Sequence, residues 1–275
     1  MVSFPNCKIN LGLHIVEKRS DGYHNLETVF YPIQITDVLE VIPAHAGKSF
    51  AFSVSGLPVA GETETNLCVK AWQLLKKDFP QLPAVTMHLH KYIPMGAGLG
   101  GGSADSAFTL QLLNEKYKLG LSAETLARYA LQLGSDCPFF IFNSPVFASG
   151  RGEILQPLQL DLGRYSFLVV NPKIHISTAQ AFGLIKPGPP LVALSEAILQ
   201  PVDTWKEIIR NDFEEPAFYY HPELQEIKNW LYNSGAIYAS MTGTGSCFYG
   251  IFEGELPDGQ WESYKLPSCE GGERA

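Results

Sequence analysis

Residues 94–107 read Pro94-Met95-Gly96-Ala97-Gly98-Leu99-Gly100-Gly101-Gly102-Ser103-Ala104-Asp105-Ser106-Ala107. Five of the seven residues from 96 to 102 are glycine. Glycine adopts positive φ without strain and lets a backbone approach a ligand closely. Successive backbone N–H groups can then surround an anion, and the N-terminus of a following helix adds its positive dipole end. The stretch therefore predicts a phosphate-binding loop.

Three well-known phosphate-loop patterns fit this stretch poorly. Gly96, Gly98 and Gly101 satisfy the spacing G-x-G-x-x-G, but the dinucleotide-binding loop follows the first strand of its unit, and here at least three strand-like runs come earlier. Residues 47–49, Gly-Lys-Ser, match the last three positions of a Walker loop, but Ile42 occupies the position where that loop requires its first glycine. No H-R-D or D-F-G sequence follows, which argues against a protein kinase.

The residues around the loop predict alternating strands and helices. Apolar residues alternate with polar ones from Val85 to Leu89, which indicates a strand leading into the loop. Helical spacing follows over 103–117 and again over about 122–133, where Gly134 provides a C-terminal cap. Because Pro138 prevents continuation of that helix, Asp136 is expected on a short connector beside the apolar run 139–142.

The N-terminal segment predicts a half-buried strand followed by a turn. Apolar residues from Ile9 to Ile15 alternate with Lys8, Asn10 and other polar residues, so these two polar side chains are expected to share one face. Ser20-Asp21-Gly22 then forms a turn signal that presents Tyr23 and His24. A change of composition over 150–163 predicts two domains, residues 1–155 and 156–275.

Composition limits the class of protein. The 275 residues are 45% hydrophobic and carry a formal net charge of −8, which argues against binding to a nucleic-acid backbone through bulk charge. The first residues lack a signal-peptide pattern, and no apolar run reaches membrane-span length, so a cytoplasmic protein without a membrane partner is expected. Five scattered cysteines without a C-x-x-C pair favour reduced thiols.

Three separated sequences together resemble the motifs of the GHMP kinase superfamily. They are Lys8-Ile9-Asn10-Leu11, the central glycine loop, and the late turn Gly243-Thr244-Gly245-Ser246. The resemblance implies an α+β fold with two domains, of which the N-terminal one is similar to ribosomal protein S5 domain 2 and the C-terminal one is ferredoxin-like. It also implies that residues 94–104 bind ATP, together with Mg²⁺.

Two further sequences narrow the resemblance within that superfamily. Arg19-Ser20-Asp21-Gly22-Tyr23-His24 and Gly134-Ser135-Asp136-Cys137-Pro138-Phe139-Phe140 are similar to those of GHMP kinases that act on a cytidine diphosphate-linked methylerythritol. The implied reaction transfers phosphate from ATP to the 2-hydroxyl of that small molecule, in the non-mevalonate route to isoprenoid precursors. The alternatives are another small-molecule GHMP kinase, for homoserine or mevalonate, and a catalytically inactive nucleotide-binding regulatory module.

The same resemblance implies individual residue roles. Asp136 would be the general base and Lys8 its charged partner, while Asn10 would contact the substrate near its reacting part. Tyr23 and His24 would hold the cytidine end, and Phe182 would stack on the cytosine ring. Cys7 and Cys137 depart from the expected pattern because they stand directly beside the two catalytic candidates. Sensitivity to thiol reagents is therefore expected.

Overall fold

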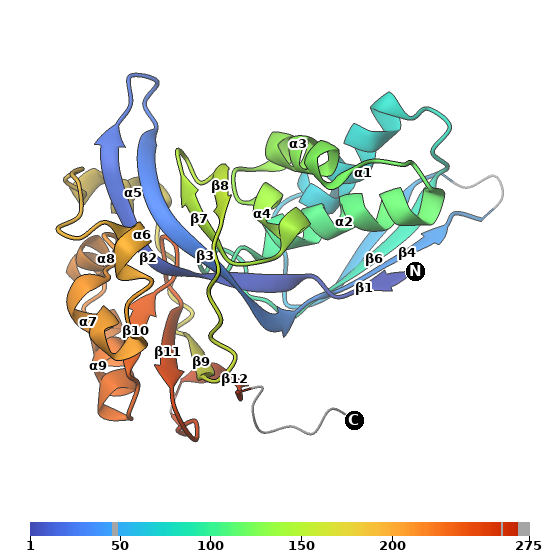
Figure 1. Cartoon of the computed structure of the whole chain (residues 1–275). Helices are drawn as coiled ribbons and strands as arrows, with labels where there is room; N and C mark the ends of the chain where they lie inside the picture. The colour runs from blue at the N-terminus through green and yellow to red at the C-terminus, as the bar shows by residue number, and fades with distance from the viewer. Residues whose placement is uncertain (46–48, 260, 269–275) are drawn as a thin grey trace. The chain divides into compact units, whose positions relative to one another are not determined.

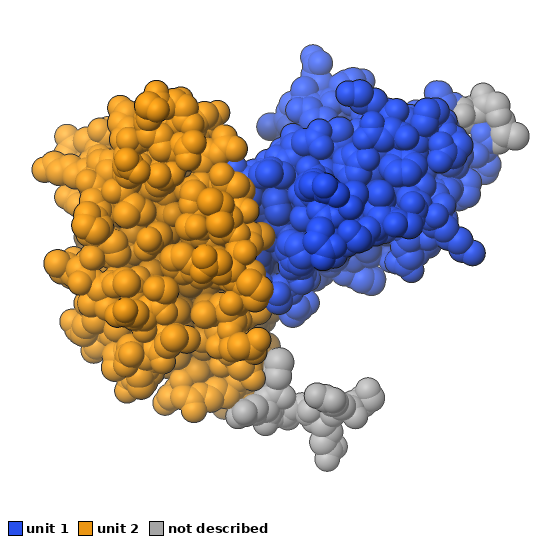
Figure 2. All heavy atoms as spheres, turned by 45° about the horizontal axis from the view of Figure 1, so that its top comes forward, with its two compact units in different colours: residues 1–8, 32–95, 100–144 blue, residues 9–31, 96–99, 145–275 orange. Residues whose placement is uncertain are grey.

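The computed structural model describes residues 1–45, 49–259 and 261–268. The chain folds into two compact units that interleave along the sequence (Figure 2). Unit 1 comprises residues 1–8, 32–95 and 100–144, and unit 2 comprises residues 9–31, 96–99 and 145–275. The domain division expected after residue 155 stays a prediction. Gly47 and Lys48, from the rejected Walker pattern, and Cys269 lie outside the described residues.

Unit 1 contains a four-stranded sheet with the order β1-β4-β6-β5. The strands are β1 (Val2–Ser3), β4 (Val38–Pro43), β5 (Ala51–Gly56) and β6 (Val85–Lys91). β5 pairs with β6 in parallel, whereas β4 pairs with β1 and β6 in antiparallel fashion. Helices α1 (Leu67–Asp78), α2 (Gly101–Tyr117), α3 (Ala123–Leu133) and α4 (Cys137–Phe142) cover one face of this sheet (Figure 1).

Local sequence explains most of these elements. The apolar residues of β6 are buried at every second position, as the alternation predicts. Helix α1 begins where the Asn66 side chain accepts a hydrogen bond from the backbone N–H of Cys68 at 2.9 Å. One local expectation was wrong, because both faces of the strand that carries Lys8 are buried. The apolar run after Asp136 forms a short helix with Pro138 in its first turn, and Asp136 lies on the predicted connector.

Unit 2 is built on two antiparallel sheets. One has the order β10-β11-β9-β12 and consists of β9 (Ser166–Asn171), β10 (Tyr238–Met241), β11 (Phe248–Phe252) and β12 (Glu262–Leu266). The other has the order β2-β3-β7-β8 and consists of β2 (Asn6–Lys18), β3 (His24–Thr36), β7 (Val146–Ser149) and β8 (Ile154–Pro157). Residues 6–8 of β2 and 32–36 of β3 belong to unit 1. The sequence analysis did not identify β7, β8 or β12.

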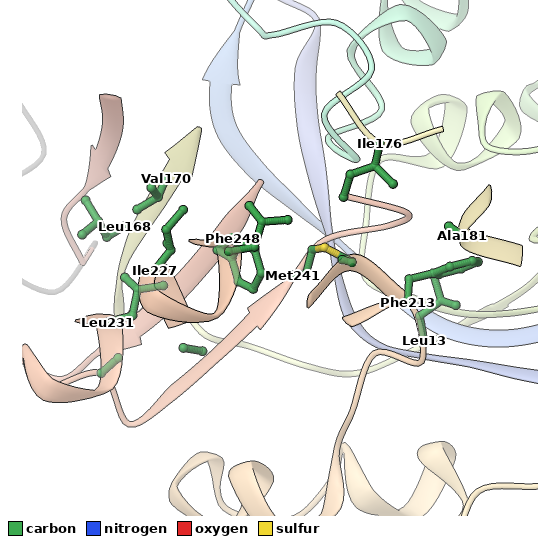
Figure 3. Packing of buried hydrophobic residues seen from close by; sticks show 14 of the residues in the cluster. Leu13, Leu168, Val170, Ile176, Ala181, Phe213, Ile227, Leu231, Met241 and Phe248 are labelled. Carbon is green, nitrogen blue, oxygen red and sulfur yellow. The ribbon is translucent and has the colours of Figure 1, made fainter. Parts of the chain in front are cut away.

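The core of unit 2 joins strands and helices that are distant in sequence (Figure 3). Leu13 of β2 packs in one cluster with Leu168 of β9, Met241 of β10 and Phe248 of β11. Helical residues such as Ala217, Ile227 and Leu231 complete this cluster. The helices of the unit are α5 (Thr178–Leu184), α6 (Leu194–Ala197), α7 (Trp205–Ile208), α8 (Glu214–Tyr220) and α9 (Glu223–Asn233). Within the described residues, no helix has the length and apolar character needed to cross a membrane.

Candidate active site

The glycine loop has the backbone geometry that its sequence predicts. Gly96, Gly98 and Gly100 all have positive φ, at 65°, 81° and 73°. Gly100 caps α2, so the helix begins directly at the end of the loop and turns its unpaired N–H groups toward it. Alternate residues with left-handed geometry followed by a helix N-terminus form an arrangement that suits an anion.

Within unit 2, residues 96–99 lie against the late glycine turn. The Thr242 Oγ1 atom is 3.0 Å from the carbonyl oxygen of Gly98, and the backbone N–H of Cys247 donates to the Ala97 carbonyl at 3.2 Å. A Cβ atom on Gly98 would lie 1.9 Å from the Thr242 carbonyl oxygen, so only glycine fits there. The structure therefore brings the second and third sequence motifs into direct contact.

Asn10 links this contact to the β2-β3 sheet. Its backbone N–H donates to Thr242 Oγ1 at 3.1 Å, and its side-chain Nδ2 donates to Thr28 Oγ1 at 2.8 Å. The Asn10 Oδ1 atom lies 3.2 Å from Thr242 Oγ1, and the hydroxyl of Tyr249 donates to the Asn10 carbonyl oxygen. The buried asparagine thus holds the first motif against the third. Thr242 is a positioning residue that the sequence analysis missed.

In unit 1, Lys8 and Asp136 form the pair that the resemblance implies. The Lys8 Nζ atom is 3.6 Å from Asp136 Oδ2, and the side chains are 4% and 35% exposed. Burial lowers the pKa of Lys8, while the neighbouring Asp136 carboxylate opposes that change. A Cβ atom on Gly100 would lie 3.1 Å from Lys8 Cε, so the lysine stem runs along the start of α2. The pair therefore stands beside the end of the glycine loop.

Asp136 owes its position to two consecutive helices. α3 ends at Leu133, and α4 begins at Cys137, so Asp136 is the residue that precedes the first turn of α4. The backbone N–H of Cys137 donates to the Gly134 carbonyl at 3.2 Å and closes the connection. A half-exposed carboxylate at a helix N-terminus, with a buried ammonium group nearby, is well placed to accept a proton from a bound alcohol.

The cysteines beside this pair do not have the exposure that reactivity requires. Cys7 and Cys137 are both fully buried. Burial raises the pKa of Cys7 to about 12 and also raises the pKa of Cys137. Because the thiolate is the reactive form of cysteine, this burial predicts that both thiols react slowly in the folded protein, contrary to the expected sensitivity to thiol reagents.

Native protein treated with iodoacetamide is expected to keep its activity and to show no label on Cys7 or Cys137 in peptide mass spectra. Protein unfolded in denaturant is expected to take up label at all five cysteines, because burial no longer protects the thiols. Rapid loss of activity with label on either cysteine, prevented by substrate, would contradict this prediction.

In unit 2, His24 and Phe182 lie together. Their rings are stacked with centroids 4.7 Å apart and an interplanar angle of 19°, and the Phe182 ring also meets Phe213 edge-on at 4.9 Å. Tyr23 is 57% exposed, and its ring lies beneath the Arg151 guanidinium at 5.0 Å. The structure therefore pairs two of the three predicted cytidine-binding residues and places the third against Arg151.

A buried ionic cluster beside the loop was missed by the sequence analysis. In unit 1, Lys91 of β6 contacts Asp37, and its Nζ also donates to Asp105 Oδ2 of α2 at 2.8 Å. A Cβ atom on Gly101 would lie 3.3 Å from Lys91 Nζ. The alternation of β6 could have revealed this cluster. Lys91 occupies the next position on the buried face after Val85, Met87 and Leu89, so its charge needs a buried partner.

Comparison with known proteins identifies the family. The family described as GHMP kinases N terminal domain matches residues 66–144, and the family described as GHMP kinases C terminal matches residues 193–260. A relative from Bacteroides thetaiotaomicron, named 4-diphosphocytidyl-2-C-methyl-D-erythritol kinase, is 52% identical and covers 95% of this chain and 96% of its own. The chain belongs to the 4-diphosphocytidyl-2-C-methyl-D-erythritol kinase family of GHMP kinases.

Further relatives agree with this assignment. A Bacteroides fragilis protein of the same name is 54% identical, with 93% of each chain covered. The crystal structure of a 4-(cytidine 5'-diphospho)-2C-methyl-D-erythritol kinase matches with a TM-score of 0.77 and 33% identity, covering 92% of this chain and 91% of that one. The Methanococcus jannaschii mevalonate kinase, at 13% identity and a TM-score of 0.70 with 98% of each chain covered, shares the fold. The predicted GHMP kinase fold and the predicted small-molecule kinase class are confirmed.

Proposed function

We propose that this chain transfers the γ-phosphoryl group of ATP to the 2-hydroxyl of 4-diphosphocytidyl-2-C-methyl-D-erythritol, giving the 2-phosphate and ADP. The observation that carries this proposal is the identity of 52% over almost the whole chain to a kinase named for that substrate. The Lys8–Asp136 pair beside Gly100 supports a working phosphotransferase rather than an inactive regulatory module.

The proposed reaction assigns Asp136 as general base. Its carboxylate takes the proton of the 2-hydroxyl while that oxygen forms a bond to the γ-phosphorus of ATP. The bond between the γ-phosphorus and the bridging oxygen breaks, and ADP leaves. The Lys8 ammonium stabilises the negative charge that develops on the attacking oxygen. General-base assistance typically contributes about 10²–10⁴-fold, and positioning of the two reactants can remove about 7–11 kcal/mol of the barrier.

Residues 94–104 are proposed to bind the ATP phosphates through backbone N–H groups and the N-terminus of α2. Mg²⁺, when bound, neutralises charge on the transferring phosphoryl group. In the described part of the chain, no three His, Cys, Asp or Glu side chains gather as a metal site. In kinases, the phosphates of the nucleotide commonly supply much of the Mg²⁺ coordination, so the protein itself needs to provide few ligands. We further propose that the protein acts in the cytoplasm, where ATP is available.

A substrate panel tests the proposed function. Purified protein with Mg·ATP is offered 4-diphosphocytidyl-2-C-methyl-D-erythritol, homoserine, mevalonate or galactose, and ADP release and product mass are measured. Phosphorylation of the cytidyl substrate alone is the expected result. Turnover of homoserine or mevalonate instead would replace the proposed substrate, and nucleotide binding without any turnover would favour a regulatory module.

Replacing Phe182 by leucine is expected to raise the KM for the cytidyl substrate by about tenfold, because stacking on an aromatic ring contributes about 1–3 kcal/mol per base. The KM for ATP is expected to stay within a few fold, because the ring partners of Phe182 are His24 and Phe213. Steady-state kinetics with each substrate varied separately measure both constants. A matching rise in both would contradict a cytidine-specific role.

A further inference from the structure

The cluster of Asp37, Lys91 and Asp105 places three ionisable groups in the interior of unit 1. All three residues are at most 3% exposed. With both carboxylates ionised, the cluster would carry one net negative charge. An isolated charge of this kind is costly to bury, and a buried group commonly takes up a proton instead.

Asp37 has the hydrogen bonds of an ionised carboxylate. Its Oδ1 accepts from the backbone N–H groups of Tyr92 at 2.6 Å and Ile93 at 2.9 Å, and its Oδ2 contacts Lys91. Both oxygens of Asp37 therefore act as acceptors, one of them toward Lys91. The Asp37 carboxylate is therefore the counter-ion of Lys91.

Asp105 has a different environment. Its Oδ2 accepts from the same Lys91, which Asp37 already neutralises. Its Oδ1 is buried and lacks a hydrogen-bond partner among the residues that the structure describes. Burial raises the pKa of Asp105 to about 8, Lys91 opposes the rise, and the Asp37 carboxylate adds to it. Among the described residues, the Cys68 thiol of α1 also faces Asp105. Burial raises the pKa of this thiol, so it stays neutral.

The cluster lies close to the proposed phosphate site. Asp105 is in the first turns of α2, and Lys91 approaches the Gly101 backbone at the start of that helix. Asp105, Lys91 and Gly102 also line a cavity of about 100 Å³ in unit 1, which has room for a water molecule or a ligand group. A negative charge here would oppose both the helix dipole and a bound polyphosphate.

We propose that Asp105 is held as the neutral carboxylic acid and acts as a positioning residue for the nucleotide. The Lys91 ammonium and the Asp37 carboxylate cancel, and neutral Asp105 anchors α2 to Lys91 without placing negative charge behind the phosphates. This inference rests on the proposed use of the glycine loop for ATP. It predicts that deprotonation of Asp105 weakens nucleotide binding.

The first test measures the dissociation constant of Mg·ATP by calorimetry between about pH 6.5 and 9.5, around the raised pKa of Asp105. Wild-type affinity is expected to fall by about tenfold as Asp105 ionises, which corresponds to a pKa change of about one unit on binding. Asp105→Asn, which cannot ionise, is expected to bind like the wild type near pH 6.5 and to lose this dependence. Burial lowers the pKa of Lys8, so Lys8 can add its own pH dependence. That contribution is the same in the wild type and in Asp105→Asn, and it cancels when the two are compared.

Two further variants locate the proton. Asp78→Asn replaces an exposed carboxylate at the end of α1 and is expected to keep the wild-type pH dependence. Asp37→Asn is expected to lower the melting temperature strongly, because the amide cannot serve all the donors that Asp37 accepts. Persistence of the pH dependence in Asp105→Asn would overturn the assignment.

A second measurement needs neither a variant nor activity. Side-chain carboxyl ¹³C NMR of the nucleotide-free wild-type protein is expected to show one aspartate that titrates near pH 8. If every aspartate titrates in the ordinary acid range, the proposal is wrong even if Mg·ATP binds. If that aspartate titrates near pH 8 but the cytidyl substrate is not phosphorylated, the proposed function fails and the protonated acid stands.

Discussion

Replacing Asp136 by asparagine is expected to lower kcat by about 10²–10⁴-fold, the usual contribution of a general base. The amide keeps the size of the side chain but cannot accept the proton of the substrate hydroxyl. Affinity for Mg·ATP is expected to stay within a few fold, because Asp136 precedes α4 and is not part of the glycine loop. Single-turnover phosphorylation and calorimetric binding of Mg·ATP measure the two quantities separately. A variant that retains more than a tenth of the activity would remove the base assignment.

The effect of Lys8→Met, alone and combined with Asp136→Asn, tests whether Lys8 and Asp136 act together. Lys8 Nζ is 3.6 Å from Asp136 Oδ2, so the two groups are expected to act together on the same oxygen. The double variant should then lose little more activity than Asp136→Asn alone, because residues that act as a unit have non-additive effects. Fully additive losses would show that Lys8 serves another step.

Replacing Gly98 by alanine is expected to have the second large effect. Gly98 has a φ of 81°, and a new Cβ would lie 1.9 Å from the Thr242 carbonyl oxygen. Left-handed geometry alone costs an alanine about 1–2 kcal/mol, and the backbone contact must also open. We expect a lower melting temperature and more than a tenfold loss of Mg·ATP affinity.

Gly102→Ala is the control for stability in that experiment. Gly102 lies in the first turn of α2, and the nearest atom to a new Cβ would be Met95 Cε at 3.8 Å. Alanine in a helix is more stable than glycine by about 0.5–1 kcal/mol. The melting temperature of Gly102→Ala is therefore expected to equal or exceed that of the wild type. A Gly98→Ala protein as stable as Gly102→Ala would show that the 96–99 backbone is not confined by Thr242.

The sequence by itself determined the features that depend on neighbouring residues. The spacing of Gly96, Gly98 and Gly100 predicted positive φ and a helix N-terminus, and both are present. Periodicity located α2, α3 and β6, because the burial of one face fixes the apolar repeat. The joint occurrence of separate motifs indicated the GHMP kinases, a family that the relatives confirm.

Only the tertiary structure decided which distant groups meet. Lys91 reaches Asp37 across 54 residues and Asp105 across 14, while Thr242 reaches Gly98 across 144. The burial of Cys7 and Cys137 and the raised pKa of Asp105 follow from packing by other segments. A local pattern records which residues share a face, but the surroundings that set a pKa or require a glycine come from chain segments brought together by folding.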